Sequence, residues 1–99
     1  MKVMNIEELS EILERMELSH WRIKDGKLNR TIEFKDFKQA ISFMVHLSLW
    51  IDQTNHHPEW KNVYNRLEID LITHDVNGVT QRDLDLANLL EETLTLYRI

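Results

Sequence analysis

The apolar residues of the chain recur with two periods, and each change of period marks a new element. Over 6–16 they return every three or four residues, which predicts an amphipathic helix. Asn5 with Glu8 three residues later has the pattern of a capping box at its start. The apolar positions of this helix are Ile6, Leu9, Ile12, Leu13 and Met16.

Two later segments alternate between apolar and polar residues, as half-buried strands do. The first covers 21–24 and 27–35, and the Asp25-Gly26 pair in its middle is typical of a tight hairpin turn. The second covers 59–73, where a turn at Asn65-Arg66 would divide it into two strands. Each segment is therefore interpreted as an antiparallel pair.

A second helix is predicted to begin after Asp36, which has Gln39 three residues later, and to end before Pro58. Over 37–51, ten of the fifteen residues are apolar, which is more than one core-facing stripe requires. The excess predicts a second buried face, against another copy of the chain. We therefore expect a homodimer or homotetramer formed through 37–51.

A last helix is predicted after a loop at 75–78, with Thr80 and Asp83 as its capping box. Ala87, Leu90, Leu94 and Tyr97 would line its buried side. The order αββαββα predicts an α+β fold, in which a four-stranded antiparallel sheet has three helices packed on one face. The 99 residues suffice for a single domain spanning 1–99.

The charge and composition exclude several classes of protein. Twelve Lys and Arg residues against seventeen Asp and Glu give a net charge of −5, so direct binding to nucleic acid is not expected. No apolar run reaches the roughly 18 residues of a membrane helix. The acidic residues near the N-terminus do not suit a targeting signal, and we expect a cytoplasmic protein.

Three histidines provide the main chemical signal. If 59–73 folds back as a hairpin, His74 returns to the neighbourhood of His56 and His57. Imidazoles give and take protons near neutral pH, so such a group suits acid and base catalysis. From composition alone, ordinary loop histidines remain the simpler interpretation. His20 and His46 are interpreted as structural.

Other chemistries have weaker support. Three histidines could hold zinc, but adjacent side chains in an extended segment point apart, and no His-Glu-x-x-His spacing occurs. A metal site is therefore not expected. With no cysteine and no Gly-x-Ser-x-Gly turn, acyl transfer lacks a nucleophile. Gly26 and Gly78 alone form no glycine-rich phosphate loop.

The segment from Asp52 reads DQTNHHPEWKNVYN, with Thr73-His74 nine residues after Tyr64 and then Gly78-Val79-Thr80 and Asp83. This arrangement resembles the signature of the pterin-4a-carbinolamine dehydratases, over about two fifths of the chain. The resemblance implies a cytoplasmic hydro-lyase of tetrahydrobiopterin recycling that removes water from 4a-hydroxytetrahydrobiopterin and leaves quinonoid dihydropterin. It also implies no cofactor and no metal, because the pterin is the substrate.

The resemblance assigns the catalytic positions to His56, His57 and His74. We expect His57 to act as the acid at the leaving hydroxyl, His74 as its partner near N5, and His56 to orient the ring. The substrate-binding residues are expected to be Asp52, Trp60, Thr73 and Asp83. Asp52 would hold an imidazole, although glutamate is common at its position in the family. For Trp60, packing beneath the hairpin is an equal alternative. Asp83 is more simply interpreted as a helix cap.

The resemblance also brings an alternative function. Some members of the family act as dimerisation cofactors of a homeodomain transcription factor, and the apolar surface over 37–51 would suit such a partner. The histidines are needed only for catalysis, and their presence favours the enzyme. A role in other pterin chemistry, such as molybdopterin or folate metabolism, would use the same pocket.

Overall fold

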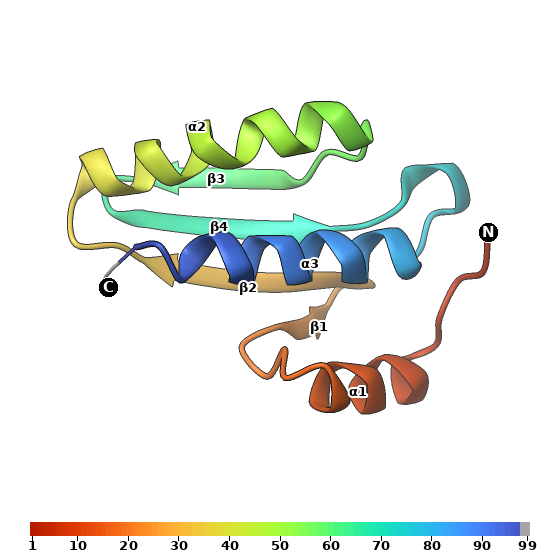
Figure 1. Cartoon of the computed structure of the whole chain (residues 1–99). Helices are drawn as coiled ribbons and strands as arrows, with labels where there is room; N and C mark the ends of the chain where they lie inside the picture. The colour runs from red at the N-terminus through yellow and green to blue at the C-terminus, as the bar shows by residue number, and fades with distance from the viewer. Residues whose placement is uncertain (98–99) are drawn as a thin grey trace.

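The computed structural model describes residues 1–97 and contains three helices and a four-stranded antiparallel sheet, which confirms the predicted fold class (Figure 1). The strands lie in the order β1-β2-β4-β3, so each hairpin supplies two neighbouring strands. The elements are α1 (Ile6–Arg15), β1 (Arg22–Lys24), β2 (Lys27–Glu33), α2 (Phe37–Thr54), β3 (Glu59–Val63), β4 (Arg66–Leu71), the 3₁₀ turn η1 (His74–Val76) and α3 (Gln81–Leu94).

Local capping begins all three helices where the sequence predicts. Asn5 forms the predicted capping box with Glu8, and the Asp36 side chain accepts a hydrogen bond from the Gln39 backbone. Such caps satisfy amide groups that have no partner inside the helix. At the other end of α2, Asn55 takes a left-handed conformation with φ of 54° and the helix stops ahead of Pro58, as predicted.

The hairpin turns agree less closely with the sequence prediction than the starts of the helices do. Asp25 and Gly26 both have positive φ, as a two-residue hairpin turn between β1 and β2 requires. In the second hairpin the turn lies at Tyr64-Asn65, one residue before the predicted position, and Arg66 already belongs to β4. Tyr64 has a φ of 52°, a conformation that side chains of its size rarely adopt, so the sequence does not mark this turn.

The hydrophobic core lies between the helices and one face of the sheet. Alternate residues of β2 and β4 point into it and are almost wholly buried. Each apolar side chain among them contributes roughly 1.5–3 kcal/mol when removed from water. The helices contribute Leu9 and Leu13 from α1, Phe43 and Leu47 from α2, and Leu84, Ala87 and Leu90 from α3. Tyr97 lies beyond the end of α3 yet packs edge-on against Phe43.

The other face of the sheet is polar. Asn29 of β2 donates hydrogen bonds to Glu68 and Asp70 of β4, while Lys24 and Lys27 form ion pairs with Glu68 and Glu59. We call this surface the polar sheet face. Because every helix in the described residues packs on the opposite side, these charged groups stay partly exposed to solvent.

The outer side of α2 is apolar and exposed. It carries a stripe at four-residue spacing, so its members lie on one line along the helix. Leu49 is 67% exposed and Val45 is 60% exposed, which is unusual for such side chains. We call this surface the α2 stripe, and its residues are Phe37, Ile41, Val45 and Leu49. None of the helices in residues 1–97 is long and apolar enough to cross a membrane.

The segment between β4 and α3 is more ordered than the predicted loop. Its middle residues form η1, and Asn77, which follows, takes the left-handed conformation with φ of 51°. Gly78 does not have positive φ; instead, it lets the N-terminal segment approach, since a Cβ there would lie 2.5 Å from Val3 Cγ1. Met4 then donates a backbone hydrogen bond to Val79, so the chain start is tied to this segment.

Candidate active site

Four segments meet at one end of the sheet, and the predicted site residues lie on them. Figure 1 shows the end of α2, the start of β3, the end of β4 and the start of α3 at this end. The antiparallel pairing of Glu59 with Asp70 sets the relation between β3 and β4. The hairpin therefore returns His74 toward the segment that carries His56 and His57, as the sequence predicts.

His56 belongs to a buried hydrogen-bond network centred on Asp83. The ring Nε2 lies 2.6 Å from Asp83 Oδ1, and Asp83 is 0% exposed. The other carboxylate oxygen accepts hydrogen bonds from the Thr73 hydroxyl and from the Thr80 backbone amide. The two threonine hydroxyls are 2.8 Å apart. The predicted capping role of Asp83 is therefore present, and the same carboxylate also holds His56 and Thr73.

His57 points away from this network, as the extended segment requires. Its side chain is 57% exposed and borders an open cavity of about 540 Å³ between the end of α2 and the start of β3. The cavity is lined by Ser48, Leu49, Ile51, Asp52, Gln53, His57, Pro58 and Trp60. Trp60 is half-buried, and it both packs on the hydrophobic core and forms part of the cavity wall.

Asp52 lies close to His57 but does not form a hydrogen bond with it. The separation of Asp52 Oδ1 and His57 Nε2 is 4.0 Å, and the Asp52 side chain is 91% exposed. A separation of this size allows only a weak, solvent-screened attraction. Asp52 thus borders the cavity without fixing the His57 ring.

His74 lies beside the polar sheet face, in contact with Glu59. The distance between His74 Nε2 and Glu59 Oε2 is 3.0 Å, and Lys27 Nζ donates a hydrogen bond of 2.6 Å to the other oxygen of Glu59. The hydrogen bond from Lys27 is the largest influence that lowers the pKa of Glu59, ahead of the attraction from His74. The carboxylate is therefore ionised at neutral pH and favours a proton on the ring atom that faces it.

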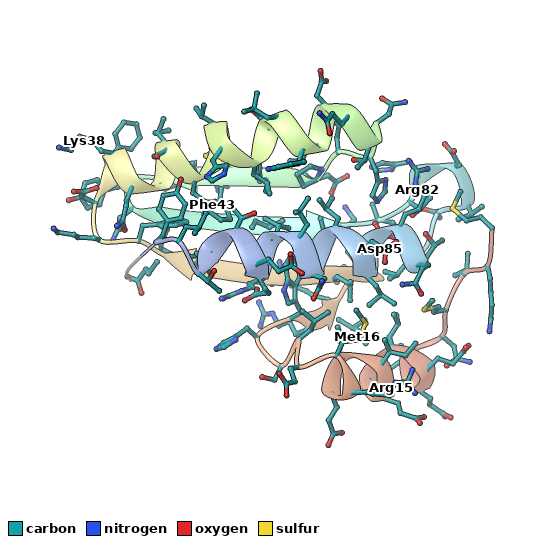
Figure 2. The ribbon with its side chains drawn as sticks, in the orientation of Figure 1. Arg15, Met16, Lys38, Phe43, Arg82 and Asp85 are labelled. Carbon is teal, nitrogen blue, oxygen red and sulfur yellow. The ribbon has the colours of Figure 1, made fainter. Side chains whose placement is uncertain are left out.

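The three histidines share one end of the fold but do not line one cavity. His57 borders the large cavity, while His56 borders a smaller one of about 150 Å³ with Arg82 and Leu86. Figure 2 shows Arg82 near the start of α3, and its guanidinium donates a hydrogen bond to the Asn55 carbonyl. His74 is exposed, outside both cavities.

Two contacts of the site were not predicted from the sequence. Glu59 was not among the expected site residues, although it follows directly after the His56-His57-Pro58 motif, which is the signal that could have indicated it. Lys27 had no such signal, because it lies in a different hairpin. Among residues 1–97, no group of three or more His, Cys, Asp and Glu side chains is arranged to hold a metal ion.

The arrangement suits proton transfer. One exposed imidazole faces a cavity, a second carries a carboxylate partner, and a third is fixed in a buried network. Histidine titrates near neutral pH, so such rings supply an acid and a base together. The apolar and aromatic cavity wall beside His57 suits a flat heterocycle.

Comparison with known proteins agrees with this chemistry. Over residues 2–93 the chain matches the family model described as pterin 4 alpha carbinolamine dehydratase. A Prochlorococcus marinus protein provisionally named pterin-4-alpha-carbinolamine dehydratase is 45% identical over 92 residues, covering 90% of this chain and 94% of its own. A Solibacter usitatus protein with the same provisional name is 51% identical over 75 residues, covering 76% and 79%.

A solved structure is similar along almost the whole chain. It is the crystal structure of a transcriptional coactivator/pterin dehydratase from Brucella melitensis, with a TM-score of 0.84 and 35% identity. The match covers 93% of this chain and 98% of that one. Taken with the histidine motif and the fold, these matches show that the chain belongs to the pterin 4 alpha carbinolamine dehydratase family.

Proposed function

We propose that this protein is a 4a-hydroxytetrahydrobiopterin dehydratase, which removes water from pterin-4a-carbinolamine. The observation that carries the proposal is the exposed His57 imidazole at the edge of a cavity with an aromatic wall. Family membership supports the substrate class. The pterin is the substrate, so the reaction needs no further cofactor.

The reaction requires one proton to be donated and one to be removed. An acid protonates the hydroxyl on C4a, the C4a–O bond breaks and water leaves. The N5–H bond then gives up its proton to a base, and its electron pair forms the C4a–N5 double bond of the quinonoid dihydropterin. Positioned acid and base groups typically contribute ~10² to 10⁴-fold to such a step.

Each proton transfer has a candidate histidine. His57 is the acid at the leaving hydroxyl, because its ring is exposed beside the cavity. His74 is its partner near N5. His56 orients the pterin and is itself held by Asp83, while Trp60 provides the wall against which a ring would stack.

Thr73 and Asp52 take lesser roles in the proposal. Thr73 donates a hydrogen bond to the Asp83 carboxylate and so supports the position of His56, rather than contacting the pterin itself. Asp52 borders the cavity 4.0 Å from His57 Nε2 and is proposed to contact the bound pterin from there.

An absorbance assay tests the proposal. A pterin-dependent hydroxylase generates the carbinolamine, and its decay is followed with and without the purified protein. We expect faster decay in proportion to the protein added. A decay rate that does not depend on the protein would contradict the proposed activity.

We propose further that the α2 stripe is where two copies of the chain meet. Four exposed apolar side chains in a line favour burial against a similar surface, and a monomer of this size would leave them in water. In light scattering, the protein is expected to run as a dimer or tetramer, and Val45→Glu is expected to shift it to smaller species. Lys38→Glu, on the exposed side of the same helix near its start (Figure 2), is the control.

The α2 stripe also favours a second candidate function, the binding of a transcription factor. The similar Brucella protein is titled a transcriptional coactivator as well as a pterin dehydratase. A chain that stays monomeric in light scattering and does not accelerate carbinolamine decay would favour this candidate over the enzyme.

A further inference from the structure

Glu59 joins three separate elements at the site. It is the first residue of β3, and its two carboxylate oxygens contact Lys27 at the start of β2 and His74 at the start of η1. Its backbone is fixed by pairing with Asp70 of β4. The carboxylate therefore has one defined position, set by the sheet and by the Lys27 ammonium.

This position has a consequence for the two nitrogens of His74. An ionised carboxylate 3.0 Å from Nε2 favours the proton on that atom. The neutral ring then has its lone pair on Nδ1, which is the atom left to accept a proton. Carboxylate partners fix histidine tautomers in the same way at many metal and catalytic sites.

The other ion pair on the polar sheet face gives a useful contrast. Glu68 also has a lysine partner, Lys24, at 3.6 Å, and it accepts a hydrogen bond from Asn29. Within residues 1–97, Glu68 forms no ion pair or hydrogen bond with a histidine. Two glutamates on one face thus share their surroundings and differ in the contact with His74.

We propose that Glu59 is the positioning residue of His74: it holds the proton on Nε2, so that Nδ1 is the atom that accepts the pterin N5 proton. Lys27 anchors the carboxylate in turn. This inference rests on the proposed dehydratase function, because it gives His74 the role of the base.

The kinetic experiment compares Glu59→Gln with Glu68→Gln in the full chain. Both changes keep the size of the side chain and remove one charge from the polar sheet face. Glu59→Gln is expected to lower kcat about fivefold, which is ~1 kcal/mol at 1.36 kcal/mol per tenfold, and to leave KM within about twofold. Glu68→Gln is expected to change neither by more than about twofold. Equal kcat values in the two variants would overturn the proposal.

A spectroscopic measurement tests the same contact without the reaction. Nitrogen NMR of the histidine rings in alkaline solution, where imidazoles are neutral, reports which nitrogen carries the proton. The Nε2–H form of His74 is expected to dominate in the original chain. The share of the Nδ1–H form is expected to rise in Glu59→Gln and to stay unchanged in Glu68→Gln. Identical His74 signals in the original chain and Glu59→Gln would overturn the proposal.

The two measurements separate the possible failures. If the original chain does not accelerate carbinolamine decay, the proposed function fails, and the NMR result alone decides whether Glu59 sets the tautomer. If the chain is active and Glu59→Gln has the same kcat as Glu68→Gln, the proposed function stands and the positioning role of Glu59 is wrong.

Discussion

His56 and His57 are neighbours in the sequence but lie in opposite environments. His56 is buried against Asp83, while His57 is largely exposed at the cavity. We call the first region the Asp83 network, made of His56, Thr73, Thr80 and Asp83, and the second the open region, made of Asp52, His57, Glu59 and His74. The buried groups are joined by hydrogen bonds of 2.6 to 2.9 Å. By contrast, the His57 ring has no hydrogen-bond partner among the described residues, and Asp52 lies 4.0 Å from it.

The difference indicates how stability and chemistry are divided at this site. A buried polar group is costly to leave without its partner, so changes in the Asp83 network act on folding. An exposed side chain is replaced with little effect on folding, so changes in the open region act on the reaction. Four measurements test this division.

The largest effect is expected for His57→Ala. Loss of the acid should lower kcat by about 10²- to 10⁴-fold, because no other described imidazole borders the large cavity. The free energy of unfolding should change by less than about 0.5 kcal/mol, as for other exposed positions. Steady-state kinetics measures the fall in kcat, and urea unfolding measures the change in stability. An unchanged kcat would remove His57 from the mechanism and contradict the assignment of the chemistry to the open region.

Unlike His57→Ala, Asp83→Ala should act mainly on the free energy of unfolding. The change removes a helix cap and leaves buried hydroxyl and imidazole groups without their partner. We expect a loss of roughly 3 kcal/mol in urea unfolding. Asp85→Ala, on the exposed side of α3 (Figure 2), is the control and should lose less than about 0.5 kcal/mol. Equal losses would show that the hydrogen bonds of Asp83 do not stabilise the fold.

Thr73→Val isolates a single hydrogen bond of the Asp83 network. Valine keeps the shape of the side chain but lacks the hydroxyl that donates to Asp83 at 2.8 Å. Because a hydrogen bond to a charged group is lost, stability should fall by about 1.5 kcal/mol. Thermal unfolding measures this loss. A stable variant with low activity would instead assign Thr73 to substrate binding.

The smallest effect concerns the pH dependence of the open region. The Lys27 ammonium lowers the pKa of Glu59 below its ordinary value of 4.5. A lowered pKa in the folded state adds stability above the unfolded pKa, and this stability is lost as the pH falls. The difference in unfolding free energy between the original chain and Glu59→Gln should therefore be full at neutral pH, begin to fall near pH 4.5 and vanish only below the lowered pKa of the folded state. A difference that persists in acid would contradict the ion pair.

Much of the fold could be predicted because its signals are local. The caps at Asn5, Asp36 and Thr80 each act within one helical turn, and Asp25-Gly26 supplies its own turn geometry. The second hairpin turn was misplaced by one residue because Tyr64 takes a left-handed conformation that its residue type does not favour. There, strand pairing on both sides decided the turn instead of the local sequence.

The elements, the buried side of the sheet and the histidine motif could all be predicted from the order of residues. The packed fold was needed to show that His56 is fixed and His57 exposed, that Asp83 serves a helix cap and an imidazole at once, and that Glu59 contacts His74. The physical reason is distance along the chain. A cap or a turn acts between near neighbours, whereas these contacts depend on how α3 packs on the sheet and on how the start of β3 meets η1 at one end of it.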